Sequence, residues 1–198
     1  MGTRSLTVFV DDHSKKEIVV MYRQFDGYIE WYGKRLCEYL QSFDEVVNGI
    51  GMDDYVRKTA NGMSCLAAQA IMHFKSGIEN RDWDVKVFNP KTGHMESGLI
   101  EGNHSGGIHL YPAGTRNCGE EYIYVVKELK KGITLEAYKA GSKEWTTQDG
   151  KHHFPAVPDE LIHKGLVSNN WFEQALANEQ AIHERKEAEW KASQELKQ

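Results

Sequence analysis

The sequence predicts an α+β fold, with a mostly antiparallel sheet of about five or six strands, helices packed on it and a long C-terminal helix. Residues 6–10 and 17–25 are rich in β-branched and aromatic side chains, which favour strands. Residues 121–127 and 133–139 are similar runs joined by a short polar connection. Residues 170–196 form a long charged segment with apolar residues at helical spacing.

The first 25 residues predict a β-hairpin. Residues 6–10 and 17–25 flank a short polar segment, residues 11–16. Antiparallel pairing of the two strands carries residues 3–5 back beside residues 23–25. Two polar groups that are distant in the sequence are therefore expected to meet at one end of the sheet.

A turn and a helix follow the hairpin. Gly27 comes after Asp26, where the chain leaves the strand, and we expect Gly27 to take the positive φ that glycine adopts without steric cost. Tyr28 and Trp31 then lead into residues 34–43, whose apolar side chains recur at helical spacing. Aromatic rings are therefore expected to border the polar group at the sheet end.

This sheet end has a functional and a structural interpretation. As a ligand site, Arg4 and Arg23 would offer charged donors, Asp26 an acceptor, and Tyr28 or Trp31 a stacking wall. As a structural feature, Arg4 and Asp26 would form a cross-strand ion pair while the rings pack over the end of the sheet.

Three short helices are predicted between the opening unit and the next strand. Ser42 and Glu45 form a capping-box pattern that starts the first helix, which ends at residues 48–49. The second runs over residues 53–60. The third, residues 64–76, is apolar almost all round and is expected to be buried.

The middle of the chain is expected to combine one strand with a long irregular region. Residues 83–89 alternate as a strand does, and a turn signal follows them. Residues 93–119 are rich in glycine, and long glycine-rich segments in a compact domain are often functional loops.

We expect no cofactor, and a divalent metal bound by the histidines of this region is the one alternative. His94, His104 and His109 offer imidazole, a preferred zinc ligand, and a metal-dependent hydrolase would use Glu101 or Asp26 as its base. Their spacing lacks the fixed helical geometry of HExxH, so scattered histidines in a solvated loop are the alternative.

The same region could instead line a pocket for an anion. Asn103 and His104 lie beside the backbone amides of residues 105–107, and consecutive amides can form anion-binding nests. The residues predicted to bind a ligand are Thr3, Arg4, Ser5, Arg23, Asp26, Gly27, Tyr28, Trp31, Asn103 and His104.

Two helices are predicted near the C-terminus. Pro158 followed by two acids starts a helix that ends at Gly165. The last helix, residues 170–196, has a thin apolar stripe, so it projects, lies across the domain or pairs with its counterpart in a homo-oligomer. We therefore divide the chain into one α+β domain, residues 1–165, and a charged C-terminal helix, residues 166–198.

Composition limits the class of protein. A chain of 198 residues with 40% hydrophobic content can bury one core. Its net charge of −5 argues against a generic nucleic-acid surface. Three cysteines without CxxC spacing suit a reducing cytoplasm, and no apolar run reaches membrane-spanning length. We expect a cytoplasmic protein without a membrane partner.

The opening also carries a family resemblance. The start MGTRS, the residues Phe25, Asp26, Gly27 and Tyr28, and Gly33 beyond them resemble an uncharacterised family of phage and bacterial proteins. Members begin Met-Gly-Thr-Arg-Ser and carry Phe- or Trp-Asp-Gly-Tyr-Pro ahead of a glycine, whereas Ile29 replaces the proline here. The resemblance covers roughly the first 40 residues and implies a phage or prophage origin rather than an activity.

Three functional hypotheses follow. The first is a phage-type accessory protein that binds a small polar or nucleotide-like ligand, or a host protein, at the sheet end. The second is a metal-dependent hydrolase that uses the glycine- and histidine-rich loop. The third is a structural protein that assembles through its C-terminal helix.

Overall fold

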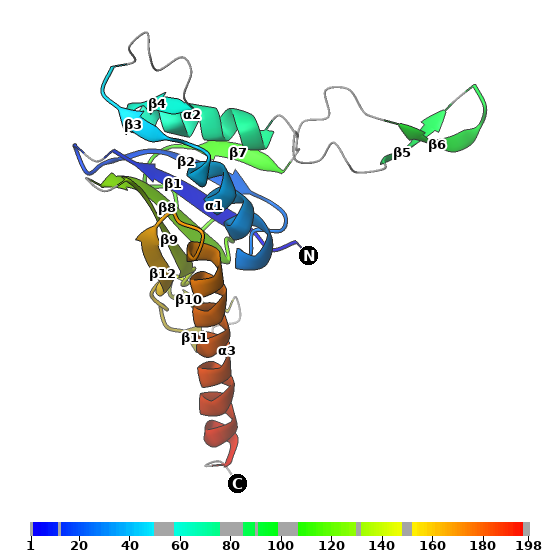
Figure 1. Ribbon diagram of the computed structural model, residues 1–198. Helices are drawn as coiled ribbons and strands as arrows, with labels where there is room; N and C mark the ends of the chain where they lie inside the picture. The colour runs from blue at the N-terminus through cyan, green and yellow to red at the C-terminus, as the bar shows by residue number, and fades with distance from the viewer. Residues whose placement is uncertain are drawn as a thin grey trace.

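The computed structural model describes residues 2–11, 13–49, 58–75, 85–89, 91–98, 107–129, 132–147 and 152–195. The fold is α+β, as predicted, and is built on a six-stranded sheet with the order β12-β9-β8-β1-β2-β7 (Figure 1). The strands of this sheet are β1 (Ser5–Val10), β2 (Glu17–Arg23), β7 (Ile108–Tyr111), β8 (Tyr122–Leu129), β9 (Gly132–Lys139) and β12 (Glu160–Leu166).

The sheet is mostly antiparallel, with one parallel pair at its centre. β1 pairs antiparallel with β2 and parallel with β8, because the connection from β7 returns the chain to the other side of the hairpin. β8 pairs antiparallel with β9, and β9 with β12. The β1–β2 hairpin is present, as predicted. β1 is an interior strand because it pairs with β2 on one side and β8 on the other.

The membership of the sheet differs from the prediction at several strands. β5 (Val85–Asn89) lies within the strand predicted at residues 83–89, but it pairs with β6 (His94–Gly98) in a separate hairpin that stands apart from the sheet in Figure 1. β12 occupies the sheet edge, although Pro158 and the acids behind it predicted a helix there. Pairing with β9 and burial of Ile162 override that local helix signal.

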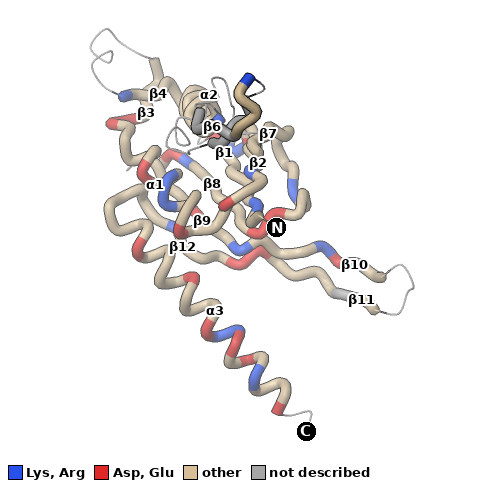
Figure 2. The backbone as a smooth tube through the Cα atoms, turned by 90° about the vertical axis from the view of Figure 1, so that its right-hand side faces the viewer, with Lys and Arg blue, Asp and Glu red and all other residues tan. Residues whose placement is uncertain are grey.

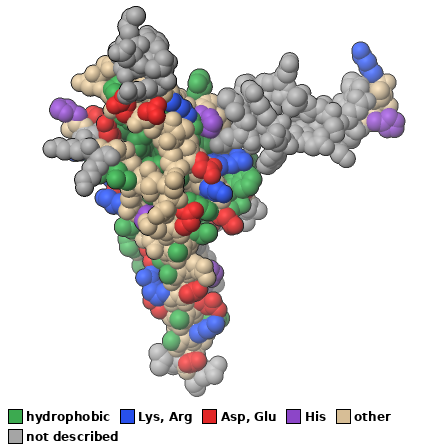
Figure 3. Space-filling model, in the orientation of Figure 1, with side chains coloured by type: hydrophobic (Ala, Val, Ile, Leu, Met, Phe, Trp, Pro, Cys, Tyr) green, Lys and Arg blue, Asp and Glu red, His purple; other side chains and the backbone are tan. Residues whose placement is uncertain are grey.

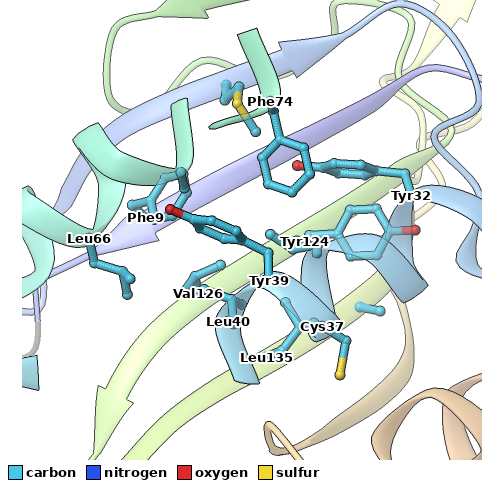
Figure 4. Packing of buried hydrophobic residues seen from close by; sticks show 14 of the residues in the cluster. Phe9, Tyr32, Cys37, Tyr39, Leu40, Leu66, Phe74, Tyr124, Val126 and Leu135 are labelled. Atoms are coloured by element: carbon cyan, nitrogen blue, oxygen red, sulfur yellow. The ribbon is translucent and has the colours of Figure 1, made fainter. Parts of the chain in front are cut away.

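Helices cover one face of the sheet and enclose the main core. They are α1 (Lys34–Gln41) with the preceding π-helical turn η1 (Ile29–Gly33), α2 (Gly62–Lys75) and α3 (Trp171–Glu195). Phe9 and Tyr124 from the sheet pack with Tyr32, Tyr39 and Phe74 from the helices (Figure 4). The Tyr32 ring is in edge-to-face contact with those of Tyr124 and Phe74, and the Tyr39 ring with that of Phe74.

Two of the predicted short helices are not formed as expected. Ser42 ends α1, where its hydroxyl donates to the carbonyl of Tyr39 at 2.5 Å, instead of starting a new helix. The β-branched pair that follows lies in β3 (Glu45–Val47), which pairs in parallel with β4 (Thr59–Asn61). The predicted helix at residues 53–60 therefore ends in a strand, and its residues 53–57 lie outside the described part.

α2 confirms the third short helix but not its complete burial. Leu66, Ala70 and Phe74 are buried against the sheet, whereas Ala68 and Met72 are exposed on the opposite side. The helix therefore has one solvent-facing stripe despite its apolar composition.

The opposite face of the sheet carries a second, smaller apolar cluster. Its buried members are Leu6, Val8, Val10, Val20, Tyr22 and Ile123. Cys118 packs against this cluster and lies in the connection between β7 and β8. That connection crosses β2 and β1, because these two strands lie between β7 and β8 in the sheet. The predicted irregular region 93–119 thus contains β6, β7 and a covering segment, while its residues 99–106 lie outside the described part.

α3 is anchored at its start and projects at its end. The Trp171 indole nitrogen donates to the carbonyl of Leu135 at 2.8 Å, and Ala175 is also buried. Beyond Ile182 the helix extends away from the sheet (Figure 1) and bears charges of both signs (Figures 2 and 3). Within the described residues, none of the helices combines the length and apolar character needed to cross a membrane.

Candidate functional site

The N-terminal residues and the Asp-Gly bend meet at one end of the sheet. Ser5 is the cross-strand partner of Arg23, and the amide of Gly27 donates to the carbonyl of Thr3 at 2.9 Å. Just before β8, the amide of Glu121 donates to the carbonyl of Arg4, also at 2.9 Å. The first two segments meet as the hairpin register predicted, and the segment that leads into β8 is a third that it did not predict.

The bend depends on close packing at Gly27. The positive φ of 55° belongs to Asp26, so the expectation that Gly27 would take it is wrong. A Cβ at Gly27 would lie 2.7 Å from both Cβ and Oγ of Ser5. Glycine is needed here because the bend lies directly on the backbone and side chain of Ser5.

Arg23 lies on the helix-covered face and is held by the fold. Its Nε donates to the carbonyl of Phe25 at 2.8 Å, and its guanidinium carbon lies 4.9 Å from the centre of the Tyr32 ring. The Tyr32 hydroxyl is hydrogen-bonded in turn to Thr7 at 2.6 Å. Only 9% of Arg23 is exposed, so its contacts fix the sheet end to the helices rather than offer a free donor.

Tyr124 completes this buried polar group. Its hydroxyl donates to the carbonyl of Gly27 at 2.9 Å and lies 3.0 Å from where a Cβ on Gly33 would be. Burial raises the pKa of Tyr124 well above its usual value, so the hydroxyl stays protonated and acts as a donor. Ser5, Gly27 and Gly33 of the family-like motif therefore have packing roles.

Arg4 lies on the other face of the sheet. One of its terminal nitrogens, Nη1, is 2.7 Å from where a Cβ on Gly119 would be. Burial raises the pKa of the Tyr22 hydroxyl, and the charge of Arg4 is near enough to oppose that rise. Because Tyr22 belongs to the second apolar cluster, Arg4 and Arg23 are separated by the thickness of the sheet.

Arg4 has no acceptor within the described residues. Its Nε is buried without a hydrogen-bond partner, and no described carboxylate, that of Asp26 included, forms an ion pair with it. The buried hydroxyl of Ser5 also has no partner in the described part, but it lies under Gly27 in the packed interior. Buried charged groups are normally paired, so Arg4 is the side chain at this end that calls for an anionic acceptor.

Aromatic rings that the sequence did not single out cluster around Tyr22, whose hydroxyl lies near the charge of Arg4. The Tyr22 ring centroid is 5.6 Å from that of Tyr111 and 5.9 Å from that of His109. Both neighbours come from β7, and His109 is exposed while Tyr111 is partly exposed. Strand alternation beginning from Arg23 would have indicated Tyr22, whereas β7 was predicted as loop.

A tight turn, residues 117–120, borders the same place. Asn117 and Gly119 have φ values of 62° and 81°. The carboxylate of Glu120 accepts hydrogen bonds from the amides of Asn117 at 2.7 Å and Cys118 at 2.6 Å. We call the group formed by Arg4, Tyr22, His109, Tyr111 and turn 117–120 the Arg4 surface.

The predicted stacking wall lies elsewhere. Tyr28 packs against the main core, and the guanidinium carbon of Arg35 lies 4.3 Å from the centre of the Trp31 ring. Among the described contacts, none joins either ring to Arg4. Tyr28 and Trp31 therefore border the helix-covered face, on the same side as Arg23.

The remaining predicted ligands are not assembled in the described part. Asn103 and His104 lie outside the described residues. His94 is on β6, in the hairpin that stands apart from the sheet, and His109 is on β7 (Figure 1). Within the described residues, no three His, Cys, Asp or Glu side chains are grouped closely enough to hold a metal ion.

A separate pocket of about 340 Å³ lies near the end of α1. Leu40, Phe43 and Ile133 supply apolar walls, while Asp44 and Glu128 supply carboxylates. It contains none of the residues predicted to bind a ligand.

The site therefore defines an α+β protein with an arginine at a sheet end that no described residue pairs, near the ring of Tyr22. No family model matches the chain, and no curated protein or solved structure is significantly similar to it.

Proposed function

We propose that this chain is a binding protein that takes a small, nucleotide-like ligand at the Arg4 surface. The observation that carries the proposal is the Arg4 guanidinium, whose buried Nε has no partner among the described residues. Phosphate and carboxylate groups present oxygens that match the planar fork of arginine. An anionic group would therefore satisfy an arginine donor at this sheet end that the described chain leaves without an acceptor.

The neighbouring rings favour a ligand with a flat face. Tyr111 and His109 flank Tyr22 and are both accessible to solvent. Bases stack readily on such side chains, and stacking does not depend on a particular base. A ring joined to an anionic group is the chemistry of a nucleotide, which we favour over a host protein because a host protein would need a broader surface.

We further propose a phage-type accessory role in the cytoplasm. The opening motif suggests the origin, and the three cysteines are free thiols, which suits a reducing compartment. We place binding ahead of catalysis because the support consists of a donor and rings, without an assembled acid–base pair.

Calorimetric titration tests the proposal. Adenosine 5′-monophosphate is the probe, with adenosine and inorganic phosphate as partial ligands. Arg4→Ala is expected to weaken binding of the monophosphate about tenfold or more, since a hydrogen bond to a charged group contributes about 1.5–3 kcal/mol. Arg35→Ala, which removes an arginine stacked on Trp31, is the matched control and should bind as the parent protein does.

Arg4→Lys keeps the charge and much of the side-chain packing, so it gives the answer if Arg4→Ala fails to fold. This variant is expected to bind the monophosphate more weakly than the parent protein, because lysine lacks the planar fork of donors that the arginine guanidinium has. The proposal is wrong if the parent protein binds none of these probes, or if both Arg4 variants bind as well as the parent.

A further inference from the structure

Glu120 holds two backbone amides next to Arg4. Its Oε1 accepts from the amide of Asn117 at 2.7 Å and its Oε2 from the amide of Cys118 at 2.6 Å. Consecutive amides that converge in this way form an anion-binding nest. In this nest the anion is a side chain of the protein itself.

Arg4 and the nest lie next to each other. Gly119 lies between the nest and Glu120, and its lack of a Cβ lets Nη1 of Arg4 come against the turn. The hydroxyl of Tyr22 lies near the charges of both Arg4 and Glu120. Glu120 contributes to raising the pKa of Tyr22, while Arg4 opposes that rise. The carboxylate nevertheless forms no ion pair with Arg4 within the described residues, so it satisfies the amides alone.

We infer that Glu120 is an internal competitor at the Arg4 surface, and that the anionic group of a ligand binds by displacing the Glu120 carboxylate from the amides of Asn117 and Cys118 while also pairing with Arg4. This inference rests on the proposed function and adds the donors that the ligand uses and the group that opposes it. A carboxylate and a phosphate present similar acceptor oxygens, so either can exchange with Glu120. A phosphate has a third oxygen, which can reach the guanidinium while two others accept from the amides.

The competing interpretation is that Glu120 only stabilises the turn. In that case its removal would lower stability and leave ligand affinity unchanged or reduced. Removing an internal competitor has the opposite effect on affinity. The apparent affinity of a ligand is its intrinsic affinity multiplied by the fraction of time that the site is open in the free protein.

The test is titration of Glu120→Gln with adenosine 5′-monophosphate, inorganic phosphate and succinate. Glutamine keeps the size of the side chain and one acceptor oxygen but removes the charge that holds the amides. We expect about tenfold tighter binding of the phosphate-bearing probes than in the parent protein, a change in the dissociation constant that calorimetry resolves. Succinate shows whether a carboxylate serves as well as a phosphate.

Glu121→Gln is the matched control. Glu121 is exposed and adjacent, so its replacement makes the same change in net charge without touching the nest. Its affinity should stay close to that of the parent. Glu120→Ala provides a second measurement if the glutamine variant fails to fold, and it should also bind more tightly.

The outcomes separate this inference from the proposed function. Tighter binding by Glu120→Gln and not by Glu121→Gln supports the internal competitor. Equal or weaker binding by Glu120→Gln, or an equal gain in both variants, overturns it, while the proposed function stands if Arg4→Ala still weakens binding. If neither the parent nor any Glu120 variant binds the probes, the proposed function itself is wrong.

Discussion

Gly27 is a residue whose importance comes from what lies next to it. Its backbone rests on Ser5, and a Cβ would approach the Ser5 amide nitrogen to 2.8 Å. Gly27→Ala would therefore force β1 and the bend apart. We expect a loss of about 1–3 kcal/mol in the free energy of unfolding, the usual effect of overpacking, measured by chemical denaturation.

Ser5, on which Gly27 rests, provides the control for Gly27→Ala. The Ser5 hydroxyl is buried without a described hydrogen-bond partner, so Ser5→Ala removes no described bond. This variant should unfold within about 1 kcal/mol of the parent protein. An alanine at Gly27 that is tolerated as well as one at Ser5 would show that the contact between them can relax.

Glu136 is a buried carboxylate at the centre of a hydrogen-bonded group. Only 2% of its side chain is exposed, and Lys127 and Lys164 lie 3.0 and 2.8 Å from its oxygens. The Tyr138 hydroxyl donates to it at 2.7 Å. Burial alone would raise the pKa of Glu136, but these hydrogen bonds outweigh burial and hold the pKa below its usual value.

The protein should therefore lose stability in acid, because the Glu136 carboxylate becomes protonated. Since its folded-state pKa lies below 4.5, its contribution is complete above that pH and is lost as the pH falls through the folded-state pKa. Glu136→Gln should cost about 1–3 kcal/mol at pH 7, and the difference from the parent should shrink in acid. Unfolding free energies measured from pH 7 to 3 test this, and a difference that is constant with pH would contradict it.

At the scale of residues, the sequence located the candidate site only in part. The hairpin correctly brings Arg4 and Arg23 to one end of the sheet, as the Ser5–Arg23 register requires. Neighbouring residues of a strand point to opposite faces, however, so Arg4 lies on the face opposite to Ser5 and its partner. Tyr22 of β2 is the ring near Arg4, and the rings that flank Tyr22 come from β7, which has no local strand signal strong enough to predict it.

At the scale of elements, strongly patterned segments were predicted well and weak ones were not. β1, β2, β8, β9, α2 and α3 each have a clear period or composition in the sequence. β12 and β3 are strands whose flanking residues look like helix starts. Their state is set by pairing with β9 and β4, which are partners that no local window contains.

α3 shows how one element combines two environments. Trp171 and Ala175 belong to the main core, whereas the segment after Ile182 is almost wholly exposed. Its contacts with the rest of the protein include the ion pairs of Arg185 and Lys186 with Glu160. Ion pairs this exposed contribute at most about 1 kcal/mol each, so this half of the helix adds little to the stability of the fold.

Truncation tests this division of α3. A chain that ends at His183 should unfold within about 1–2 kcal/mol of the parent protein, because only exposed ion pairs are removed. Trp171→Ala should cost about 3–5 kcal/mol, because it removes a buried indole and its hydrogen bond to Leu135. Chemical denaturation measures both, and a truncated chain as unstable as Trp171→Ala would contradict the division.

Light scattering on the same truncated chain addresses self-association, which stays a prediction. A lower solution mass after truncation would support assembly through the projecting half of α3. An unchanged oligomeric state would assign assembly, if the parent is an oligomer, to another surface.

At the scale of the whole molecule, the sheet separates two apolar clusters with different coverings. Helices enclose the larger cluster, while the segment that carries Cys118 crosses the smaller one. The Arg4 surface lies where that segment returns the chain to β8, beside the end of β1. It therefore exists only because β8 pairs with β1 on the side away from β2.

Local patterns in the sequence were enough to predict the α+β class, the opening hairpin, helix α2 and the long terminal helix, because each depends on periodicity and turn chemistry within a short window. The tertiary structure alone decided which strands share the sheet, which face each arginine occupies and which rings lie beside Arg4. These depend on pairing between segments far apart in the chain, such as β1 with β8 and β9 with β12. Such pairs form only when burial outweighs local preference, and that balance is a property of the whole fold.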